Sequence, residues 1–458
     1  MLFQTQGFLL AFLPVTLAAW YACAQRAARR EWALIACSLF FYAWWDARFV
    51  VLLLAQTLVS WGLAEIYLRG GRRSRWPLVL GIAANLAVLV FFKYWTFLAG
   101  NLVAATGLAL PAPTIVLPIG ISFFTFEIMS YLADVGWRDA PHYPLRRFSL
   151  FVMLFPRLIA GPIVRHHEII PQFELNPLRD GLGQRLSIGA MLLIAGLVKK
   201  VFLADALAPF ADSAFASVAT TAPPFQTAWI GALAFTFQLF LDFSAYSEMA
   251  IGIALMLGFT LPQNFDAPYT ATSIRDFWRR WHMTLSRYLR DYVYIPLGGS
   301  REGVGRYIWA TLFTMGLCGL WHGAGWTFLA WGLLHGAALL VCHAWQARGF
   351  TLPSPVAWAL TFLFVVIGWV LFRAPNFGVA AAMLQGMAGL NGLGGSLEGA
   401  PLIALAAAVS MIGPTTYKAM TTMLRPRPVF AVLAASLAVI VLLEVGAGQP
   451  QTFIYFQF

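Results

Sequence analysis

Residues 307–347 read YIWATLFTMGLCGLWHGAGWTFLAWGLLHGAALLVCHAWQA, without a single Asp, Glu, Lys or Arg. A helix needs about 20 mainly apolar residues to cross a bilayer, so this stretch is long enough for two crossings. The whole chain of 458 residues is 60% hydrophobic and 11% charged, whereas a soluble domain carries roughly 25% charged residues. These values exclude a soluble globular protein and predict a polytopic membrane protein.

Further apolar stretches predict about eleven transmembrane helices in a single all-α membrane domain, residues 1–458. Residues 148–164 are apolar but short and broken by Pro156, Gly161 and Pro162, which is typical of a re-entrant element. The Gly-rich stretch 386–399 is expected to be a loop. The expected spans lie near 3–24, 32–45, 49–68, 77–99, 115–135, 186–208, 226–258, 307–345, 354–373, 402–424 and 429–447.

The formal net charge of +11 comes from basic residues in the short breaks between apolar stretches. This placement indicates membrane topology and argues against nucleic-acid binding.

The four cysteines lie in apolar segments without CxxC spacing, so we expect neither a disulfide framework nor a zinc site from them. Among the first five spans, one set of alternate breaks carries only Arg48, and the positive-inside rule therefore predicts an extracytoplasmic N-terminus. The other set contains Arg26, Arg29, Arg30, Arg69, Arg72, Arg73, Arg75, Arg138, Arg146 and Arg147.

Residues 275–290, RDFWRRWHMTLSRYLR, predict one amphipathic helix. Two interpretations remain open. The helix can anchor in the membrane interface, with arginines meeting lipid phosphates, or it can border an active site and attract an anionic substrate. The apolar arc comprises Phe277, Trp278, Trp281, Leu285, Tyr288 and Leu289, and the polar stripe comprises Arg275, Arg279, His282, Ser286 and Arg290.

His322 lies in the charge-free stretch, within the glycine-rich segment LCGLWHGAGW (317–326). An ionisable residue in such a segment is a candidate functional residue. Neutral imidazole can accept a proton from a hydroxyl, which makes His322 a candidate general base. The alternative is a hydrogen bond to a neighbouring helix. For His335 and His343 we expect packing or hydrogen bonding.

Carboxylates in apolar segments, Glu127, Asp134 and Asp242, suit either the proton relay of a transporter or partners that fix histidines and arginines. The consecutive residues 166–168 (HHE) cannot share a helical face as an HExxH pair does, so no metal site is expected from His166, His167 and Glu168. Arg157 and Arg165 are expected to line a polar crevice or to contact lipid phosphate.

Several long blocks of the sequence, which follow one another in the family's order, resemble the membrane-bound O-acyltransferase family. The resemblance is to its bacterial branch that acts on alginate and teichoic acid. The resemblance covers most of the chain. Small departures are Glu248, where the family often has Asp, and Thr284, where it often has Ser. The blocks are PIGISFFTFEIMSYLADV, FPRLIAGPIVRHHEIIPQF, DFSAYSEMAIGIALMLGF, SIRDFWRRWHMTLSRYLRDYVYIPLGGSR, LWHGAGWTFLAWGLLHG and the terminal FIYFQF.

The resemblance implies that His322 is the principal catalytic residue and that His282 is a second one. It also implies a ring of membrane helices, with re-entrant and interfacial helices, around a thinned centre where a cytoplasmic donor funnel meets an extracytoplasmic acceptor surface. The catalytic core would span approximately residues 115–345.

The activity implied by the resemblance moves an acetyl group from a cytoplasmic thioester, acetyl-CoA or another acyl thioester, across the bacterial inner membrane. The acceptor would be the hydroxyls of an exported polysaccharide such as alginate, reached directly or through a periplasmic acetyltransferase partner. No bound cofactor is expected. His322 would deprotonate the attacking hydroxyl, and His282 would position or polarise the acyl carbonyl or assist proton transfer.

The residues expected to bind substrate are Arg275, Arg279, Trp278, Ser286, Trp321, Asp242 and Tyr246, with Arg290 as a further arginine for donor phosphates. D-alanyl transfer from a carrier protein to teichoic acid, acetylation of peptidoglycan or cellulose, and a covalent acyl-histidine remain alternatives. A proton-coupled transporter is the alternative from another functional class.

Overall fold

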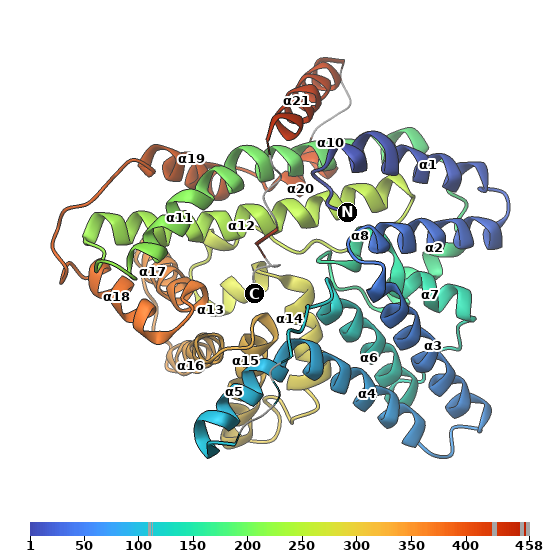
Figure 1. Ribbon diagram of the computed structural model, residues 1–458, viewed down its shortest axis with the longest axis horizontal. Helices are drawn as coiled ribbons and strands as arrows, with labels where there is room; N and C mark the ends of the chain where they lie inside the picture. The colour runs from blue at the N-terminus through green and yellow to red at the C-terminus, as the bar shows by residue number, and fades with distance from the viewer. Residues whose placement is uncertain (109–110, 112, 424–427, 449–452, 455–458) are drawn as a thin grey trace. The chain divides into compact units, whose positions relative to one another are not determined.

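The computed structural model describes residues 1–108, 111, 113–423, 428–448 and 453–454 (Figure 1). Among these residues every regular element is a helix and no strand occurs, which confirms the all-α class. They form two compact units. The first comprises Met1–Ile194, Tyr246–Pro262 and Pro426–Pro450, and the second comprises Ala195–Ala245, Gln263–Arg425 and Gln451–Phe458. The expectation of one catalytic domain stays a prediction.

Polar side chains join the helices of the first unit. Gln56 of α3 donates to Asn85 Oδ1 of α4 at 3.0 Å, and Asn85 Nδ2 donates to Ser60 Oγ at 2.8 Å. Such hydrogen bonds satisfy buried polar groups between apolar helices. The elements are η1 (Gly7–Phe12), α1 (Leu13–Ala22), α2 (Ala27–Ala43), α3 (Arg48–Arg69), α4 (Trp76–Leu89), η2 (Val90–Tyr94), α5 (Trp95–Thr106), α6 (Ile121–Trp137), α7 (Leu145–Met153), α8 (Phe155–Leu158), α9 (His166–Ile169), η3 (Ile170–Glu174), most of α10 (Leu182–Val198) and α21 (Pro428–Ala447).

The second unit contains the charge-free stretch, which forms two helices joined by a short turn. The backbones of the two helices approach closely where Gly319 and Gly332 lie. A Cβ at Gly319 would collide with the Phe328 carbonyl, and a Cβ at Gly332 would collide with the Met315 carbonyl. The elements are η4 (Lys199–Ala204), α11 (Asp205–Ser217), most of α12 (Phe225–Met256), η5 (Pro268–Thr270), α13 (Ile274–Arg280), α14 (Met283–Leu289), η6 (Arg290–Tyr294), α15 (Val304–His322), α16 (Trp326–Ala347), α17 (Ser354–Arg373), α18 (Phe377–Met387), α19 (Ala400–Met411), α20 (Thr416–Lys418) and η7 (Ala419–Met423).

By length and composition, seven helices in the described chain can span a membrane, or eight if the bent pair Ala400–Met411 and Thr416–Met423 is one span. The chain is therefore a multi-pass membrane protein. The expected number of about eleven stays a prediction, because this count covers the longest and most apolar helices of the described residues and several other expected spans form shorter ones. Gly7–Ala22 and α6 are examples, and a 17-residue helix such as α6 extends only about 26 Å at 1.5 Å per residue.

The segment expected to be re-entrant is broken, as its prolines and glycine predict. Helices α7 and α8 are separated at Leu154, and the Phe155 N–H donates to Ser38 Oγ at 3.2 Å. Most of the stretch expected to be a loop, 386–399, is one: α18 ends at Met387, and residues 388–399 connect it to α19. The first of these findings shows how a helix break inside buried protein obtains a hydrogen-bond partner for its backbone.

Candidate active site

His322 is the last residue of α15 and lies directly before the glycine turn that leads into α16. Its side chain is buried among aromatic rings. The ring centroid lies 4.9 Å from that of Trp321, 5.4 Å from Trp331 and 5.3 Å from Phe372. The glycines expected to loosen this segment therefore have two roles, since Gly323 and Gly325 form the turn and Gly319 brings α16 close.

His282 interrupts the single amphipathic helix that residues 275–290 predict. The structure has two helices there, α13 and α14, separated by Trp281 and His282. His282 has φ 42° and ψ 52°, a left-handed conformation that is rare outside glycine. The prediction of one helix was wrong because periodicity describes only the faces of a helix, whereas the break is stabilised by contacts with a distant loop.

Asn264 is the residue of that loop that holds the break. Its backbone carbonyl accepts from the Met283 N–H at 2.9 Å, and its side-chain Oδ1 lies 3.3 Å from the Thr284 nitrogen and 2.9 Å from Thr284 Oγ1. The same Oδ1 lies 3.1 Å from His282 Nδ1. Asn264 could not be identified from the sequence, because no local pattern marks an asparagine that acts 18 positions before its partner.

These contacts determine the tautomer of His282. A backbone N–H can only donate, so the amide atom that faces Thr284 is the oxygen. His282 Nδ1 must then carry the hydrogen that Asn264 accepts, which leaves a lone pair on Nε2. Among the described residues, Nε2 is buried without a hydrogen-bond partner. Burial lowers the pKa of His282 to about 3, so the ring is neutral at physiological pH.

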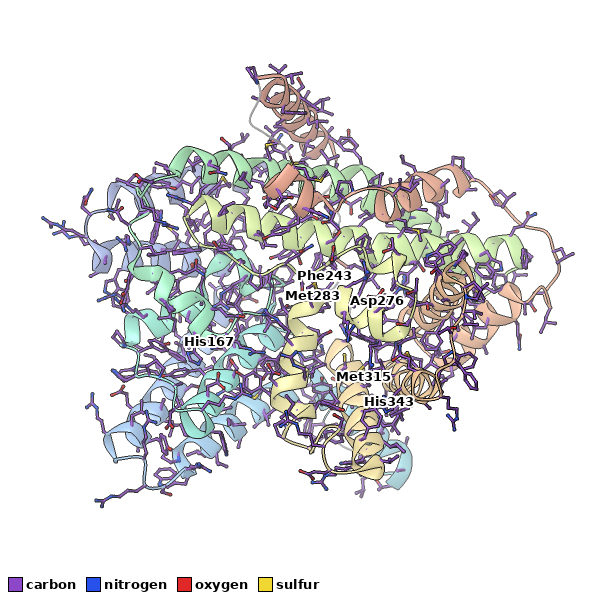
Figure 2. The ribbon with its side chains drawn as sticks, turned by 180° about the vertical axis from the view of Figure 1, so that it is seen from behind. His167, Phe243, Asp276, Met283, Met315 and His343 are labelled. Atoms are coloured by element: carbon purple, nitrogen blue, oxygen red, sulfur yellow. The ribbon has the colours of Figure 1, made fainter. Side chains whose placement is uncertain are left out.

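The two predicted catalytic histidines lie close together. The ring centroids of His282 and His322 are 6.4 Å apart, and the Trp321 ring contacts both, at 5.9 Å and 4.9 Å. Phe243 of α12 packs edge-on against His282 at 4.7 Å, and in Figure 2 it lies beside Met283, the first residue of α14. The arrangement resembles a pair of proton-transfer groups in an aromatic enclosure.

A cavity of about 220 Å³ is lined by residues of α13, α14, η6, α15 and α16, and neither His282 nor His322 is among its lining residues. On α15 its wall includes Thr311, Met315 and Cys318, which are spaced by four and three residues and so share one face of the helix. His322 follows Cys318 by four residues and is the next member of the same face. The remaining lining includes Arg275, Trp278, Ser286, Leu289, Arg290, Tyr294, Tyr307, Thr314 and Leu339.

Several residues predicted to bind substrate therefore lie around this cavity. Arg275 is exposed, and its guanidinium donates to Gln346 Oε1 at 3.1 Å. Trp278 is buried, and its indole N–H donates to His335 Nδ1 at 3.2 Å, which confirms the hydrogen bonding expected for His335. Arg290 forms an ion pair with Asp291 at 2.7 Å. Arg279 is exposed but does not line the cavity.

Asp242 and Tyr246 have other neighbours. The Asp242 carboxylate lies 3.0 Å from Lys200 Nζ and accepts the Ile454 N–H at 2.8 Å. It is thus held by an ion pair and a backbone hydrogen bond within the second unit. Tyr246 belongs to the first unit, where its ring stacks on Phe3 at 4.8 Å.

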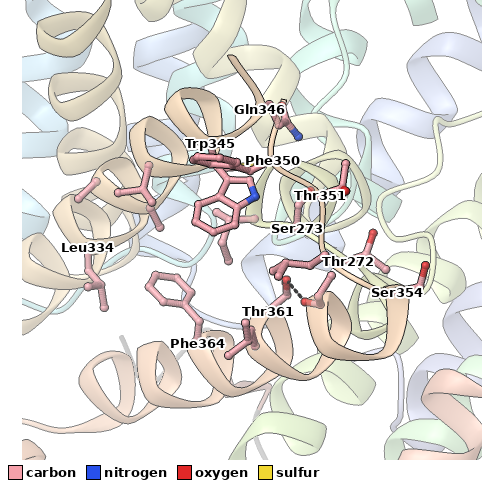
Figure 3. Close-up of a pocket in the computed structure, with 18 residues that line it drawn as sticks. Thr272, Ser273, Leu334, Trp345, Gln346, Phe350, Thr351, Ser354, Thr361 and Phe364 are labelled. Carbon is pink, nitrogen blue, oxygen red and sulfur yellow. Dashed lines mark hydrogen bonds between the residues drawn. The ribbon is translucent and has the colours of Figure 1, made fainter. Parts of the chain in front are cut away.

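A larger cavity of about 790 Å³ lies between α16 and α17 (Figure 3). Its walls are mainly apolar and include Leu334, Trp345, Phe350 and Phe364. Its lining residues include hydroxyl and amide groups but no Arg or Lys, so the cavity lacks the charged donors that bind phosphate most strongly. The smaller cavity, with Arg275 and Arg290, is the one with the electrostatics for an anionic ligand.

The carboxylates of the first unit have cationic partners. Glu127 and Arg157 form a buried ion pair, and Asp134 Oδ1 lies 3.1 Å from Arg138 Nη1. Arg157 was expected to line a crevice or meet lipid, but its side chain is fully buried. The expectation was wrong because a buried guanidinium requires a counter-ion, which α6 supplies. These pairs favour the interpretation of the carboxylates as structural partners.

The comparisons with known proteins identify the family of the chain. Residues 124–378 match the model of the membrane-bound O-acyltransferase family. The chain is 43% identical to a probable alginate O-acetylase of Pseudomonas putida, over 84% of this chain and 80% of that protein. It is 39% identical to a peptidoglycan O-acetyltransferase of Helicobacter pylori, with coverages of 86% and 81%. A teichoic acid D-alanyltransferase of Bacillus subtilis is 26% identical, with coverages of 65% and 77%. Because the family model matches residues 124–378 and the Pseudomonas putida relative is 43% identical over 84% of this chain, the chain belongs to the membrane-bound O-acyltransferase family.

Proposed function

We propose that this enzyme transfers an acetyl group from a thioester donor, acetyl-CoA, to hydroxyl groups of an exported polysaccharide such as alginate. The observation that carries the proposal is the pair of buried imidazoles, His282 and His322, 6.4 Å apart, together with a cavity lined by two arginines and by residues of α14 and α15. The alginate and peptidoglycan enzymes among the relatives support acetyl as the group and a polymer as the acceptor.

In this reaction the oxygen of an acceptor hydroxyl attacks the thioester carbonyl carbon, the C–S bond breaks, and the thiol leaves. His322 accepts the hydroxyl proton and returns a proton to the departing thiolate. A positioned general base contributes roughly 10²- to 10⁴-fold to such a step. The aromatic rings around His322 exclude water, which protects the thioester from hydrolysis.

His282 assists this proton transfer by accepting a hydrogen bond from the acceptor hydroxyl at Nε2, while His322 takes the proton itself. Its Nδ1 hydrogen is committed to Asn264, and a neutral ring with the lone pair on Nε2 cannot donate to a carbonyl oxygen from that atom. Of the roles that the sequence leaves open, this tautomer therefore favours proton transfer over carbonyl polarisation.

The donor would occupy the smaller cavity, with its phosphates near Arg275 and Arg290 and its thioester toward His322. The uncharged part of the donor, between its phosphates and its thioester, would lie along the face of α15 that contains Thr311, Met315 and Cys318. Trp278 and Ser286 line the same wall. Arg279, which lies outside the lining, would act by long-range attraction.

In the cell we place the enzyme in the bacterial inner membrane with an extracytoplasmic N-terminus. The excess of arginine in one set of alternate breaks supports this orientation. The donor would then arrive from the cytoplasm, and a periplasmic acetyltransferase partner would complete delivery to the polymer.

The experiment compares parent protein, His322→Ala and His282→Ala in detergent, with radiolabelled acetyl-CoA as donor and alginate oligomers, with and without a periplasmic extract, as acceptor. His343→Ala is the matched control, because His343 is exposed and its ring packs on that of Tyr307. We expect transfer to fall about 10²-fold or more in both site variants and to be unchanged in the control.

Unchanged turnover of His322→Ala, with donor binding retained, would contradict the assignment of the base. Transfer from a D-alanyl carrier protein, but not from acetyl-CoA, would instead favour the activity of the teichoic acid relative. Flux of labelled acetyl donor into proteoliposomes without ester formation would favour a transporter.

A further inference from the structure

The last turn of α6 and the short helix α9 bring three metal-ligating side chains together in the first unit. We propose that Asp134, His166 and His167 bind a divalent transition-metal ion, with Zn²⁺ the best match to the ligand set. Two imidazole nitrogens and one carboxylate oxygen are a common donor set for zinc, with water in the fourth position. The proposal does not depend on the acyltransfer site, since none of these residues belongs to it.

The distances are close to those of a zinc site. His166 Nε2 lies 3.1 Å from Asp134 Oδ2, and the ligand atoms of all three residues lie within 4.8 Å of one another. With metal–ligand bonds of about 2.0 to 2.1 Å, ligand atoms in a tetrahedral site are roughly 3.3 Å apart. Asp134 and His166 already have this separation. His167 is exposed and can turn inward by a side-chain rotation.

Neighbouring residues form hydrogen bonds to His166 and Asp134 that orient these two side chains as metal ligands. His166 Nδ1 lies 3.1 Å from the Tyr143 hydroxyl, so Nδ1–H can donate to the phenol oxygen while Nε2 faces the metal. Asp134 Oδ1 accepts from Arg138 Nη1 at 3.1 Å, which leaves Oδ2 toward His166. Such partners fix the tautomer and the ring orientation of a ligating histidine.

The local backbone explains why Asp134, and not the neighbouring Glu168, supplies the carboxylate. Glu168 Oε2 accepts from the Arg165 N–H at 2.9 Å and caps α9. Asp134 lies in the last turn of α6, and its carbonyl accepts from Arg138 N and Ala140 N as that helix ends. The sequence interpretation considered only consecutive residues, and it could not include a carboxylate 32 positions earlier in the chain.

Burial differs across the cluster in a way that suits a bound ion. Asp134 and His166 are each 3% exposed, whereas His167 faces solvent. The buried pair, Asp134 and His166, would bind the ion away from water, and the ion would enter from the solvent side at His167. A hydrogen-bonded chain of Tyr143, His166 and Asp134 would need no contribution from His167, so His167 distinguishes a metal site from such a chain.

The test uses full-length protein purified through a tag without histidines and treated with a chelator. Zn²⁺ alone is titrated, bound metal is counted by mass spectrometry, and Co²⁺ is then added to record the absorption bands of a tetrahedral site. We expect one ion per chain, a rise in the melting temperature, and a spectrum with nitrogen and oxygen ligands.

His167→Ala should weaken binding roughly tenfold or more while the protein stays folded, because this side chain is exposed. Tyr143→Phe, which removes only a hydroxyl, should weaken binding by roughly tenfold. His343→Ala, another exposed histidine, should bind as the parent does. The proposal is overturned if the parent takes up no stoichiometric metal, or if His167→Ala binds Zn²⁺ with unchanged affinity, in which case the cluster is a hydrogen-bonded chain only.

Discussion

At the scale of single residues, the proposed role of His282 depends on which of its ring nitrogens carries a hydrogen. Asn264 decides this through one amide oxygen shared among His282 and Thr284. Because the Thr284 N–H also donates to this oxygen, the orientation of the Asn264 amide is fixed by the fold. The tautomer of His282 is therefore set before substrate binds.

Asn264→Ala should lower kcat by about 10²-fold with little change in KM for the donor, because His282 loses its fixed tautomer while the cavity keeps its lining. The loss of buried hydrogen bonds should also cost about 1–3 kcal/mol of stability. Steady-state kinetics and thermal unfolding measure the two effects. Asn264→Asp, which keeps an acceptor oxygen, should recover part of kcat, and equal losses in both variants would contradict the tautomer argument.

The acid sensitivity of the protein should include a contribution from His282. Its folded pKa of about 3 lies below the unfolded value of 6.5, so between these values the unfolded chain binds the proton more readily. Stability from this residue is therefore complete above pH 6.5 and is lost as the pH falls toward 3, by up to about 1.4 kcal/mol per pH unit. Thermal unfolding from pH 7 to pH 4 should show a shallower loss for His282→Asn, and parallel curves would argue against a buried neutral ring.

At the scale of elements, His322 is positioned by the packing of α15 on α16. That packing relies on Gly319 and Gly332, each of which faces a carbonyl of the other helix. A shift of the α15 end would move His322 directly, since it is the last residue of the helix.

Gly319→Ala should lower the stability by about 1–3 kcal/mol and reduce turnover, because its Cβ overlaps the Phe328 carbonyl. Gly316→Ala is the matched control, since its Cβ would lie 3.4 Å from the side chains of Leu329 and Leu333. There we expect neutral or slightly higher stability, as alanine is the better helix former. If both variants unfolded at the same temperature as the parent, close packing at Gly319 would not be a constraint.

The comparison of sequence and structure also belongs at this scale. The sequence located the elements that carry His282 and His322, because a charge-free stretch and an arginine-aromatic block are local signals. It did not reveal the break at His282 or the role of Asn264, since both depend on contact between residues distant in the chain. Arg157 was misplaced for the same reason, because its partner Glu127 is 30 positions away.

At the scale of the whole molecule, each compact unit contains a buried ion pair. Arg157 and Glu127 form the pair in the first unit, and Lys200 bridges Asp242 and Asp205 in the second, at 3.0 and 2.7 Å. Removal of one partner of a buried pair leaves an uncompensated charge and costs about 3–5 kcal/mol.

Lys200→Met should therefore destabilise the second unit preferentially, and Arg157→Met the first. Hydrogen–deuterium exchange of each variant measures this by segment, with faster exchange expected in 195–245 for the former and in 121–158 for the latter. The double variant Lys200→Met/Asp242→Asn should recover part of the loss. A uniform increase across the chain in both single variants would contradict the assignment of one pair to each unit.

The burial of α12 has a consequence for the response to lipid. In its most apolar stretch 94% of the residues are buried, against 6% in α21. Bilayer thickness acts on a protein through the side chains that touch acyl chains, by tilting helices or deforming the lipid around them. The helix that carries Phe243 against His282 therefore offers few side chains to acyl chains, whereas α21 offers many. In vesicles of short and long lipids the inclination of α21 should accordingly change more than that of α12.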